Sequence, residues 1–139
     1  NFQQIKSLHH EIEVLKELKH ENIVQYLGSS VEGNEFNIFL EYVPGGSITS
    51  IINRFGPLPE HLIRIYTKQI LQGLQYLHNH KIIHRDIKGA NILVDNKGVI
   101  KLADFGACKK LKGLVSSLET NSLKGTVYWM APGTFDTHH

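Results

Sequence analysis

The stretch that decides the fold consists of two short motifs, HRDIKGAN at residues 84–91 and DFG at residues 104–106. The segment between them has apolar residues within 92–95 and 99–102, on either side of the turn-forming sequence NKG at residues 96–98. This pattern predicts a β-hairpin. Each motif alone is a weak signal, because it is common by chance. The order of a polar loop, a hairpin and a second loop is a much stronger signal, because this combination seldom arises by coincidence.

A third motif, GTVYWMAP, follows at residues 125–132. The three motifs together match the signature set of protein kinases, and the resemblance covers residues 5–133. It implies a bilobal kinase fold of the α+β class, truncated here to a partial kinase domain. Residues 1–43 are then the N-lobe remnant from helix C to the hinge, and residues 44–139 are the start of the C-lobe through the activation segment.

Side chains in these motifs suit phosphoryl transfer, which requires positioning and cations more than covalent chemistry. Asp86 is a carboxylate that can accept the proton of a substrate hydroxyl and orient its oxygen. Asn91 and Asp104 offer the hard oxygen ligands that Mg²⁺ prefers. Lys88 points the same way as Asp86 if the segment is extended, so it can neutralise the transferring phosphate of ATP. Gly106 is expected to let the backbone turn sharply after Asp104.

The chain resembles, in particular, the MAP kinase kinase kinase group of serine/threonine kinases. This resemblance rests on LKHENIVQYLG at residues 18–28, EYVPGGS at residues 41–47 and GTVYWM at residues 125–130. Lys88 in the catalytic loop is also similar to serine/threonine rather than tyrosine kinases. The implied reaction is transfer of the ATP γ-phosphate to Ser or Thr of a protein in a MAP kinase cascade, and the implied substrate is a MAP kinase kinase.

The resemblance also implies an ATP site at the edge of the two lobes. Leu40 matches the gatekeeper beside the adenine pocket. The backbones of Glu41 and Val43 would form hydrogen bonds with adenine, Ser47 would lie near the ribose, and Leu93 would pack under the adenine ring.

Regulatory roles follow from the same resemblance. Glu11 matches the helix glutamate that pairs with the ATP-holding lysine. Ser122 lies where many kinases carry the activating phosphate, and Arg85 and Lys109 would receive that phosphate through charge-assisted hydrogen bonds. The other hydroxyls that compete with Ser122 are Ser116, Ser117, Thr120 and Thr126.

Thr126 has a second expected role, because a threonine in this motif would contact Asp86 and Lys88 and favour hydroxyl substrates. The resemblance further implies a stacked apolar spine. Its members, which are also ordinary core residues by composition, are Leu15, Tyr26, His84 and Phe105.

Apolar periodicity predicts the remaining elements. Alternating steps of three and four predict helices, β-branched and aromatic runs around a turn predict two antiparallel strands, and the segment after the hairpin has no period. The expected elements are helices at 3–19, after Gly46 through Phe55, and at 60–80, strands at 23–31 and 36–43, and a long mobile loop at 104–129.

Composition excludes several classes of protein. The 139 residues are 41% hydrophobic and 20% charged, which is typical of a globular domain, and the formal charge of +2 does not favour a nucleic-acid partner. No apolar run approaches the ~20 residues of a membrane helix. The single cysteine, Cys108, cannot form an internal disulfide, which favours a cytoplasmic protein. Cys108 itself is interpreted as a small filler, with redox sensitivity as the alternative.

The sequence also departs from the family pattern. It has no Gly-x-Gly-x-x-Gly loop and no Val-Ala-x-Lys strand, which are expected to lie before Asn1, and Gly133 stands where the motif expects Glu. We therefore expect the chain by itself to have marginal stability and no measurable phosphotransfer. Two alternatives to a piece of an active enzyme stay open, a truncated kinase that acts as a scaffold and an incomplete gene model.

Overall fold

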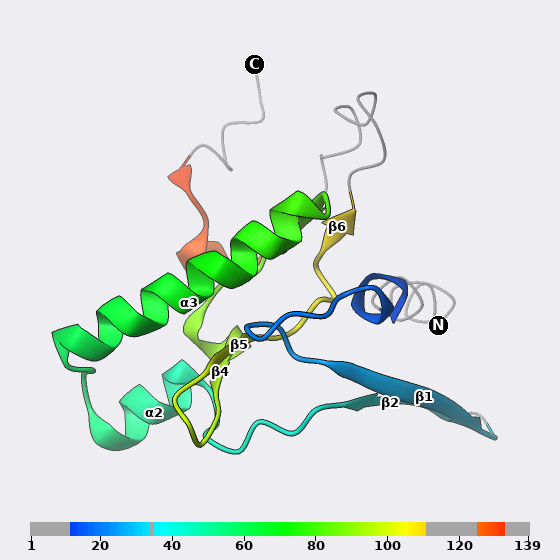
Figure 1. Cartoon of the computed structure of the whole chain (residues 1–139), viewed down its shortest axis with the longest axis horizontal. Coiled ribbons are helices and arrows are strands. Elements are labelled where there is room, and N and C mark those ends of the chain that lie inside the picture. The colour runs from blue at the N-terminus through cyan, green and yellow to red at the C-terminus, as the bar shows by residue number, and fades with distance from the viewer. Residues whose placement is uncertain (1–11, 34, 111–124, 133–139) are drawn as a thin grey trace.

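The computed structural model describes residues 12–33, 35–110 and 125–132. Its helices and antiparallel strand pairs form an α+β fold, in which the ribbon β1–β2 extends away from the helices α2 and α3 (Figure 1). The elements are a helical segment at 12–16, β1 (Tyr26–Glu32), β2 (Glu35–Leu40), α2 (Ile48–Phe55), α3 (Glu60–Asn79), β3 (Ile82–Ile83), η1 (Gly89–Asn91), β4 (Ile92–Val94), β5 (Ile100–Leu102), β6 (Lys109–Lys110) and η3 (Val127–Trp129).

The helices and hairpins predicted from periodicity are confirmed in α2, α3, β1–β2 and β4–β5. The first helix, however, ends at residue 16 rather than 19. The backbone N–H of Leu18 donates to the carbonyl of Leu15 in a tight turn, which keeps Leu18 buried although it has left the helix. Helical spacing therefore predicted the buried side chain correctly and the end of the helix incorrectly.

The two predicted strands at 23–31 and 36–43 are both shorter than expected, and the first residues of the earlier strand pair with β5 instead. Ile23 forms a parallel bridge with Leu102 of β5, and the Val24 N–H donates to the Leu102 carbonyl at 3.0 Å. The Leu102 N–H in turn donates to the carbonyl of Asn22 at 2.9 Å. The segment before β1 is thus fastened to β5, which leads into the DFG motif.

The prediction of an unstructured loop at 104–129 is wrong at both of its described ends. Lys109 and Lys110 form β6, which pairs antiparallel with β3 in the register Ile82↔Lys110 and Ile83↔Lys109. Residues 127–129 form the 3-10 helix η3. A two-residue strand and a single 3-10 turn are too short to produce a period in the sequence.

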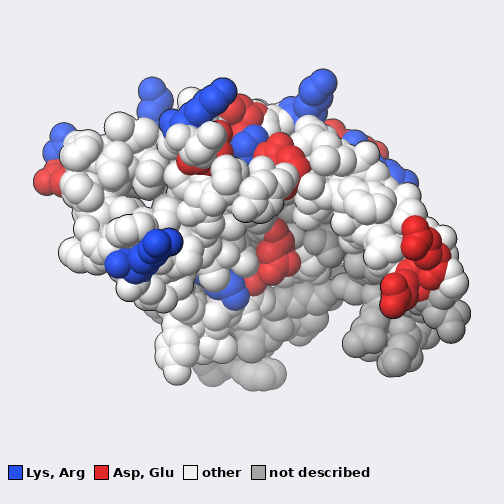
Figure 2. Space-filling model, turned by 90° about the horizontal axis from the view of Figure 1, so that it is seen from below, with Lys and Arg blue, Asp and Glu red and all other residues white. Residues whose placement is uncertain are grey.

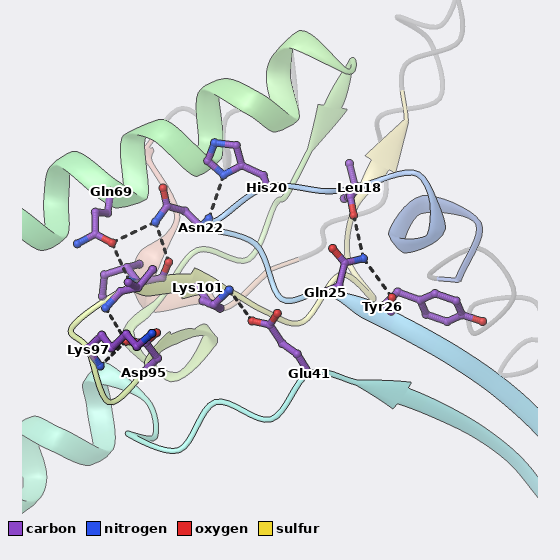
Figure 3. Close-up of polar contacts among 12 residues, drawn as sticks. Leu18, His20, Asn22, Gln25, Tyr26, Glu41, Gln69, Asp95, Lys97 and Lys101 are labelled. Carbon is purple, nitrogen blue, oxygen red and sulfur yellow. Dashed lines mark hydrogen bonds and ion pairs between the residues drawn. The ribbon is translucent and has the colours of Figure 1, made fainter.

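A polar cluster connects α3 to the hairpin β4–β5 through the segment before β1 (Figure 3). The buried Asn22 side chain donates to Gln69 Oε1 at 3.1 Å and to the Ile100 carbonyl at 3.0 Å. Gln69 Oε1 also accepts from the Ile100 N–H at 2.8 Å. Because a buried polar group without partners is costly, this closed set of bonds fixes the position of α3 against β5.

The apolar core lies between α3, the hairpin β4–β5 and the helical segment at 12–16. Cys108 is buried within it, which agrees with the interpretation of a filler. The core cluster comprises Val14, Leu15, Leu18, Ile23, Leu77, Ile82, Ile92, Val94, Ile100, Leu102, Phe105 and Cys108.

Within the described ranges, no helix is long and apolar enough to cross a membrane. On the described part of the face in Figure 2, Lys and Arg side chains lie scattered among uncharged and acidic ones and form no continuous basic surface.

The segment 41–47 leads from β2 to α2 and passes very close to β4. The Val94 N–H donates to the Gly46 carbonyl at 2.9 Å, and Ser47 caps α2 by accepting from the Ser50 N–H. A Cβ placed on Gly45 would lie 2.2 Å from the Val94 carbonyl oxygen. Only glycine fits at this approach of two backbones.

We expect Gly45→Ala to lower the free energy of unfolding by about 1–3 kcal/mol, the usual range for overpacking, because a backbone oxygen cannot move aside as a flexible side chain would. Gly28→Ala is the matched control, since its new Cβ would meet only Phe39 Cδ2 at 3.8 Å. Denaturant titration of both variants checks this. Equal stability of the two variants would contradict the packing described here.

Candidate active site

The loop after β3 brings Asp86 and Lys88 together. The backbone of Lys88 is extended, with φ −160° and ψ 162°, so both side chains point to one side, as predicted. Lys88 Nζ lies 3.4 Å from Asp86 Oδ2. Both side chains are largely buried, so the ion pair is shielded from water more than a surface pair would be.

Thr126 reaches this pair from a position forty residues further along the chain. Lys88 Nζ donates to Thr126 Oγ1 at 2.5 Å, and Thr126 Oγ1 donates to Asp86 Oδ1 at 2.7 Å. The contacts predicted for Thr126 are therefore confirmed. One hydroxyl that accepts from the ammonium and donates to the carboxylate fixes the orientation of both charged groups.

Asn91, in η1, completes the surroundings of Asp86. Its Nδ2 donates to the Asp86 carbonyl at 2.9 Å and to Asp86 Oδ2 at 3.1 Å, and the residue is only 7% exposed. Since the amide nitrogen is occupied by two oxygens of Asp86, the Oδ1 atom is the group that Asn91 can offer to a cation.

Asp104 follows β5 and is exposed. The Ala103 N–H beside it donates to the Asn91 carbonyl at 2.9 Å, which connects the two predicted magnesium ligands through adjacent backbone. The sharp turn expected at Gly106 is present, because Gly106 and Ala107 form a turn closed by the Cys108 N–H, which donates to the Phe105 carbonyl at 3.0 Å. Asp104 itself lies in the left-handed region, with φ +61°. An aspartate tolerates this left-handed conformation better than most residues, and its Oδ1 accepts from the Gly106 N–H at 3.4 Å.

The His84 ring joins the two loops from the interior, at 1% exposure. Its Nε2 lies 2.9 Å from the Ala103 carbonyl, and its Nδ1 accepts from the Asp86 N–H at 3.3 Å. Because a carbonyl only accepts and an amide N–H only donates, the ring is neutral with its proton on Nε2. Burial lowers the pKa of His84, and this outweighs the opposing effects of the Ala103 hydrogen bond and of the nearby carboxylates of Asp104 and Asp86.

The pKa of Asp86 is lowered from its ordinary value. Burial alone would raise the pKa of this carboxyl, but the hydrogen bonds from Thr126, Lys88 and Asn91, together with the Lys88 charge, outweigh burial. Asp86 is therefore an ionised carboxylate at neutral pH, which is the form that can accept a proton.

The residues expected around adenine lie at the end of β2, in the segment that follows it, and in β4. Leu40, at 43% exposure, ends β2, and Val43 is buried. Ser47 forms an antiparallel bridge with Leu93 of β4, so these two predicted positions are adjacent. The Ser47 hydroxyl also caps α2, a role that the motifs did not predict.

Of the predicted regulatory residues, Glu11 and Ser122 lie outside the described residues, and Lys109 is described only by its backbone in β6. Arg85 has φ +67°, and its Nε donates to the Ala107 carbonyl at 2.7 Å, so it contacts the segment that follows DFG. The spine residues Leu15, His84 and Phe105 are buried, and the His84 and Phe105 rings lie 5.2 Å apart. Tyr26 is half-buried against the same core.

One contact of the activation segment was missed. Lys110 of β6 forms an ion pair with Glu17, just after the first helical segment, and this pair lowers the pKa of Glu17. The two residues are 93 positions apart and have no shared motif, so the sequence carried no signal for their contact.

The family model described as "Protein kinase domain" matches residues 1–139 of this chain. The chain is 60% identical over 128 residues to mitogen-activated protein kinase kinase kinase ANP1 of Arabidopsis thaliana, covering 92% of this chain and 19% of that protein. It is 57% identical over 129 residues to serine/threonine-protein kinase STE11 of Saccharomyces cerevisiae, covering 92% of this chain and 18% of that protein.

A third similar protein is mitogen-activated protein kinase kinase kinase 19 of Mus musculus, which is 53% identical over 134 residues, covering 93% of this chain and 10% of that protein. The fold and the match over the whole chain define a protein kinase domain. The chain belongs to the protein kinase family, and its similarity to MAP kinase kinase kinases is as expected from its motifs. It spans a fifth or less of the length of these relatives.

We expect Thr126→Val to raise the pKa of Asp86 towards its ordinary value, because the variant loses the hydrogen bond that Thr126 donates to Oδ1. Carboxyl-detected NMR titration measures this shift. Asp95 is an internal control, since hydrogen bonds from the backbone of Val99 and Lys97 lower its pKa at a distance from the loop. An unchanged Asp86 pKa in the variant would show that Thr126 does not stabilise the carboxylate.

Proposed function

We propose that this chain is the catalytic part of a serine/threonine protein kinase that transfers the ATP γ-phosphate to a protein in a MAP kinase cascade. The observation that carries the proposal is the cluster in which Thr126, Lys88 and Asn91 all bind the carboxylate of Asp86. The substrate we propose is a MAP kinase kinase, supported by the similarity to proteins named MAP kinase kinase kinases.

In this proposal Asp86 accepts the hydroxyl proton of the substrate Ser or Thr, and its fixed orientation aims that oxygen at the phosphorus. Lys88 neutralises negative charge on the phosphate during transfer. Thr126 fixes the position of the Asp86 carboxylate relative to the Lys88 ammonium, because it contacts each of them directly. The chain supplies positioning and charge, which is most of what this reaction requires from a protein.

The described residues fit a magnesium ion. Asn91 can offer Oδ1, because its Nδ2 is already occupied, and Asp104 offers an exposed carboxylate. Mg²⁺ in nucleotide sites is held by one or two protein carboxylates together with phosphates and waters, so a larger set of protein ligands is not needed. When bound, the ion supplies positive charge against the phosphates. Asn91 and Asp104 would hold it.

We propose that ATP lies between an N-lobe part, residues 1–43, and a C-lobe part, residues 44–139. The backbones of Glu41 and Val43 would contact adenine, with Leu40 beside it. Ser47 and Leu93 would lie on the other side, and their bridge supports this arrangement because it places the two positions together. Activation by phosphorylation of Ser122, with Arg85 and Lys109 as receiving cations and Glu11 as the lysine partner, is part of the same proposal.

We expect Asp86→Asn in the full-length protein to lower kcat for phosphorylation of a MAP kinase kinase by roughly 10²–10⁴, the usual contribution of a general base, and to leave the KM for ATP unchanged. Transfer of labelled phosphate measures both constants. Asp95→Asn is the matched control, since this half-buried hairpin carboxylate lies outside the cluster and the amide oxygen can still accept the turn hydrogen bonds. Full kcat in Asp86→Asn would contradict the proposed role.

A further inference from the structure

An ion pair that the motifs do not include joins the end of β2 to β5. Lys101 Nζ lies 2.6 Å from Glu41 Oε1, and the two side chains are 16% and 24% exposed (Figure 3). Lys101 is directly opposite Leu93 in the hairpin β4–β5, so both side chains lie on the same face. Lys101 also lies three residues before Asp104, which follows the same strand.

The Glu41 end of the pair is fixed to the neighbouring strand. Its N–H donates to the Gln25 carbonyl at 2.9 Å. The Gln25 side chain then donates to the carbonyls of Tyr26 and Leu18 at 3.1 and 3.5 Å, which attaches it to the turn after the first helical segment (Figure 3). Glu41 is thus the point where β1, β2 and the hairpin β4–β5 are connected.

The segment 41–46 is attached to the hairpin β4–β5 at both of its ends. At the start the attachment is the Lys101–Glu41 ion pair, and at the end it is the hydrogen bond from the Val94 N–H to the Gly46 carbonyl. Val43 lies between the two attachments. Because both lie on one rigid hairpin, they set the path of the backbone that leads from the first to the second.

The burial of this ion pair determines how strongly it can hold segment 41–46 against the hairpin. A fully exposed ion pair contributes little, because water and salt screen it. Where both side chains are more than three-quarters covered, removal of one partner leaves the other charge poorly solvated, and the segment must move to expose it. Lys97 on the tip of the same hairpin is exposed, and its backbone N–H donates to Asp95 Oδ1, so this lysine offers the opposite case.

From these contacts we propose that Lys101 is a positioning residue that holds segment 41–46 at a fixed place relative to Asp104 and so sets the affinity for the nucleotide. The inference rests on the proposed function, because it takes the backbones of Glu41 and Val43 as the adenine contacts. Lys101 touches neither the nucleotide nor the reacting atoms in this scheme. It acts through Glu41.

The test uses the full-length protein and two readouts, one of which needs no nucleotide. Amide hydrogen exchange in the nucleotide-free protein follows residues 41–43, and titration with MgATP gives its Kd. We expect Lys101→Met and Glu41→Gln each to speed exchange at 41–43 and to raise the Kd for MgATP, both by roughly three- to tenfold, the range for a partly buried ion pair. Exchange within Ser29–Val31 of β1 stays unchanged.

Matched variants separate the ion pair from general damage. Lys101→Arg keeps the charge and should keep both readouts near wild type, and Lys97→Met removes an exposed lysine from the same hairpin and should change neither. The double variant Lys101→Met with Glu41→Gln should be no worse than either single variant, because the two residues act through one interaction.

The outcomes are distinct. Faster exchange at 41–43 with weaker MgATP binding supports the inference. Unchanged exchange in both Lys101→Met and Glu41→Gln overturns it, and so does faster exchange with unchanged MgATP affinity. A wild-type protein that binds no MgATP overturns the proposed function and the nucleotide part of the inference, while the exchange rates still decide whether Lys101 holds the segment.

Discussion

The site depends on one buried imidazole. His84 donates from Nε2 to the Ala103 carbonyl and accepts at Nδ1 from the Asp86 N–H, so a single ring fixes the loop with Asp86 against the segment that ends in Asp104. A backbone hydrogen bond from the Ala103 N–H to the Asn91 carbonyl makes a further connection between the same two segments. With the ring neutral, both hydrogen bonds form at once. A protonated ring would turn Nδ1 into a donor facing the Asp86 N–H, and the attachment to the catalytic loop would be lost.

Beside this connection, the polar groups of the site lie within hydrogen-bond distance of one another. The Asp86 carboxylate is surrounded by partners from two segments, the loop that carries Lys88 and Asn91 and the segment that carries Thr126. The backbone that His84 binds at Ala103 continues through β5 to Lys101, which extends the connection to the start of segment 41–46. Catalytic groups, magnesium ligands and the proposed adenine edge are therefore all positioned by the hairpin β4–β5 and the loops attached to it.

The sequence predicted most of what is local or periodic. Helical spacing predicted α3, and the resemblance to kinases implied the contacts of Thr126 with Asp86 and Lys88. The parts that were missed are contacts between residues far apart in the chain, such as Lys101 with Glu41, Lys110 with Glu17, and β3 with β6. Such pairs have no period and no fixed spacing. The turn at Gly106 was predicted from residue type, but the left-handed conformation of Asp104 was not.

The protonation state of His84 tests this account most directly. Long-range ¹⁵N–¹H correlation spectra of the histidine-labelled protein, recorded across a pH titration, distinguish the two neutral forms and the charged one. We predict a neutral ring protonated on Nε2, with a pKa below the ordinary histidine value because the ring is buried. A ring protonated on Nδ1, or a His84 that titrates at or above the ordinary value, would contradict the claim that this imidazole holds the two loops together.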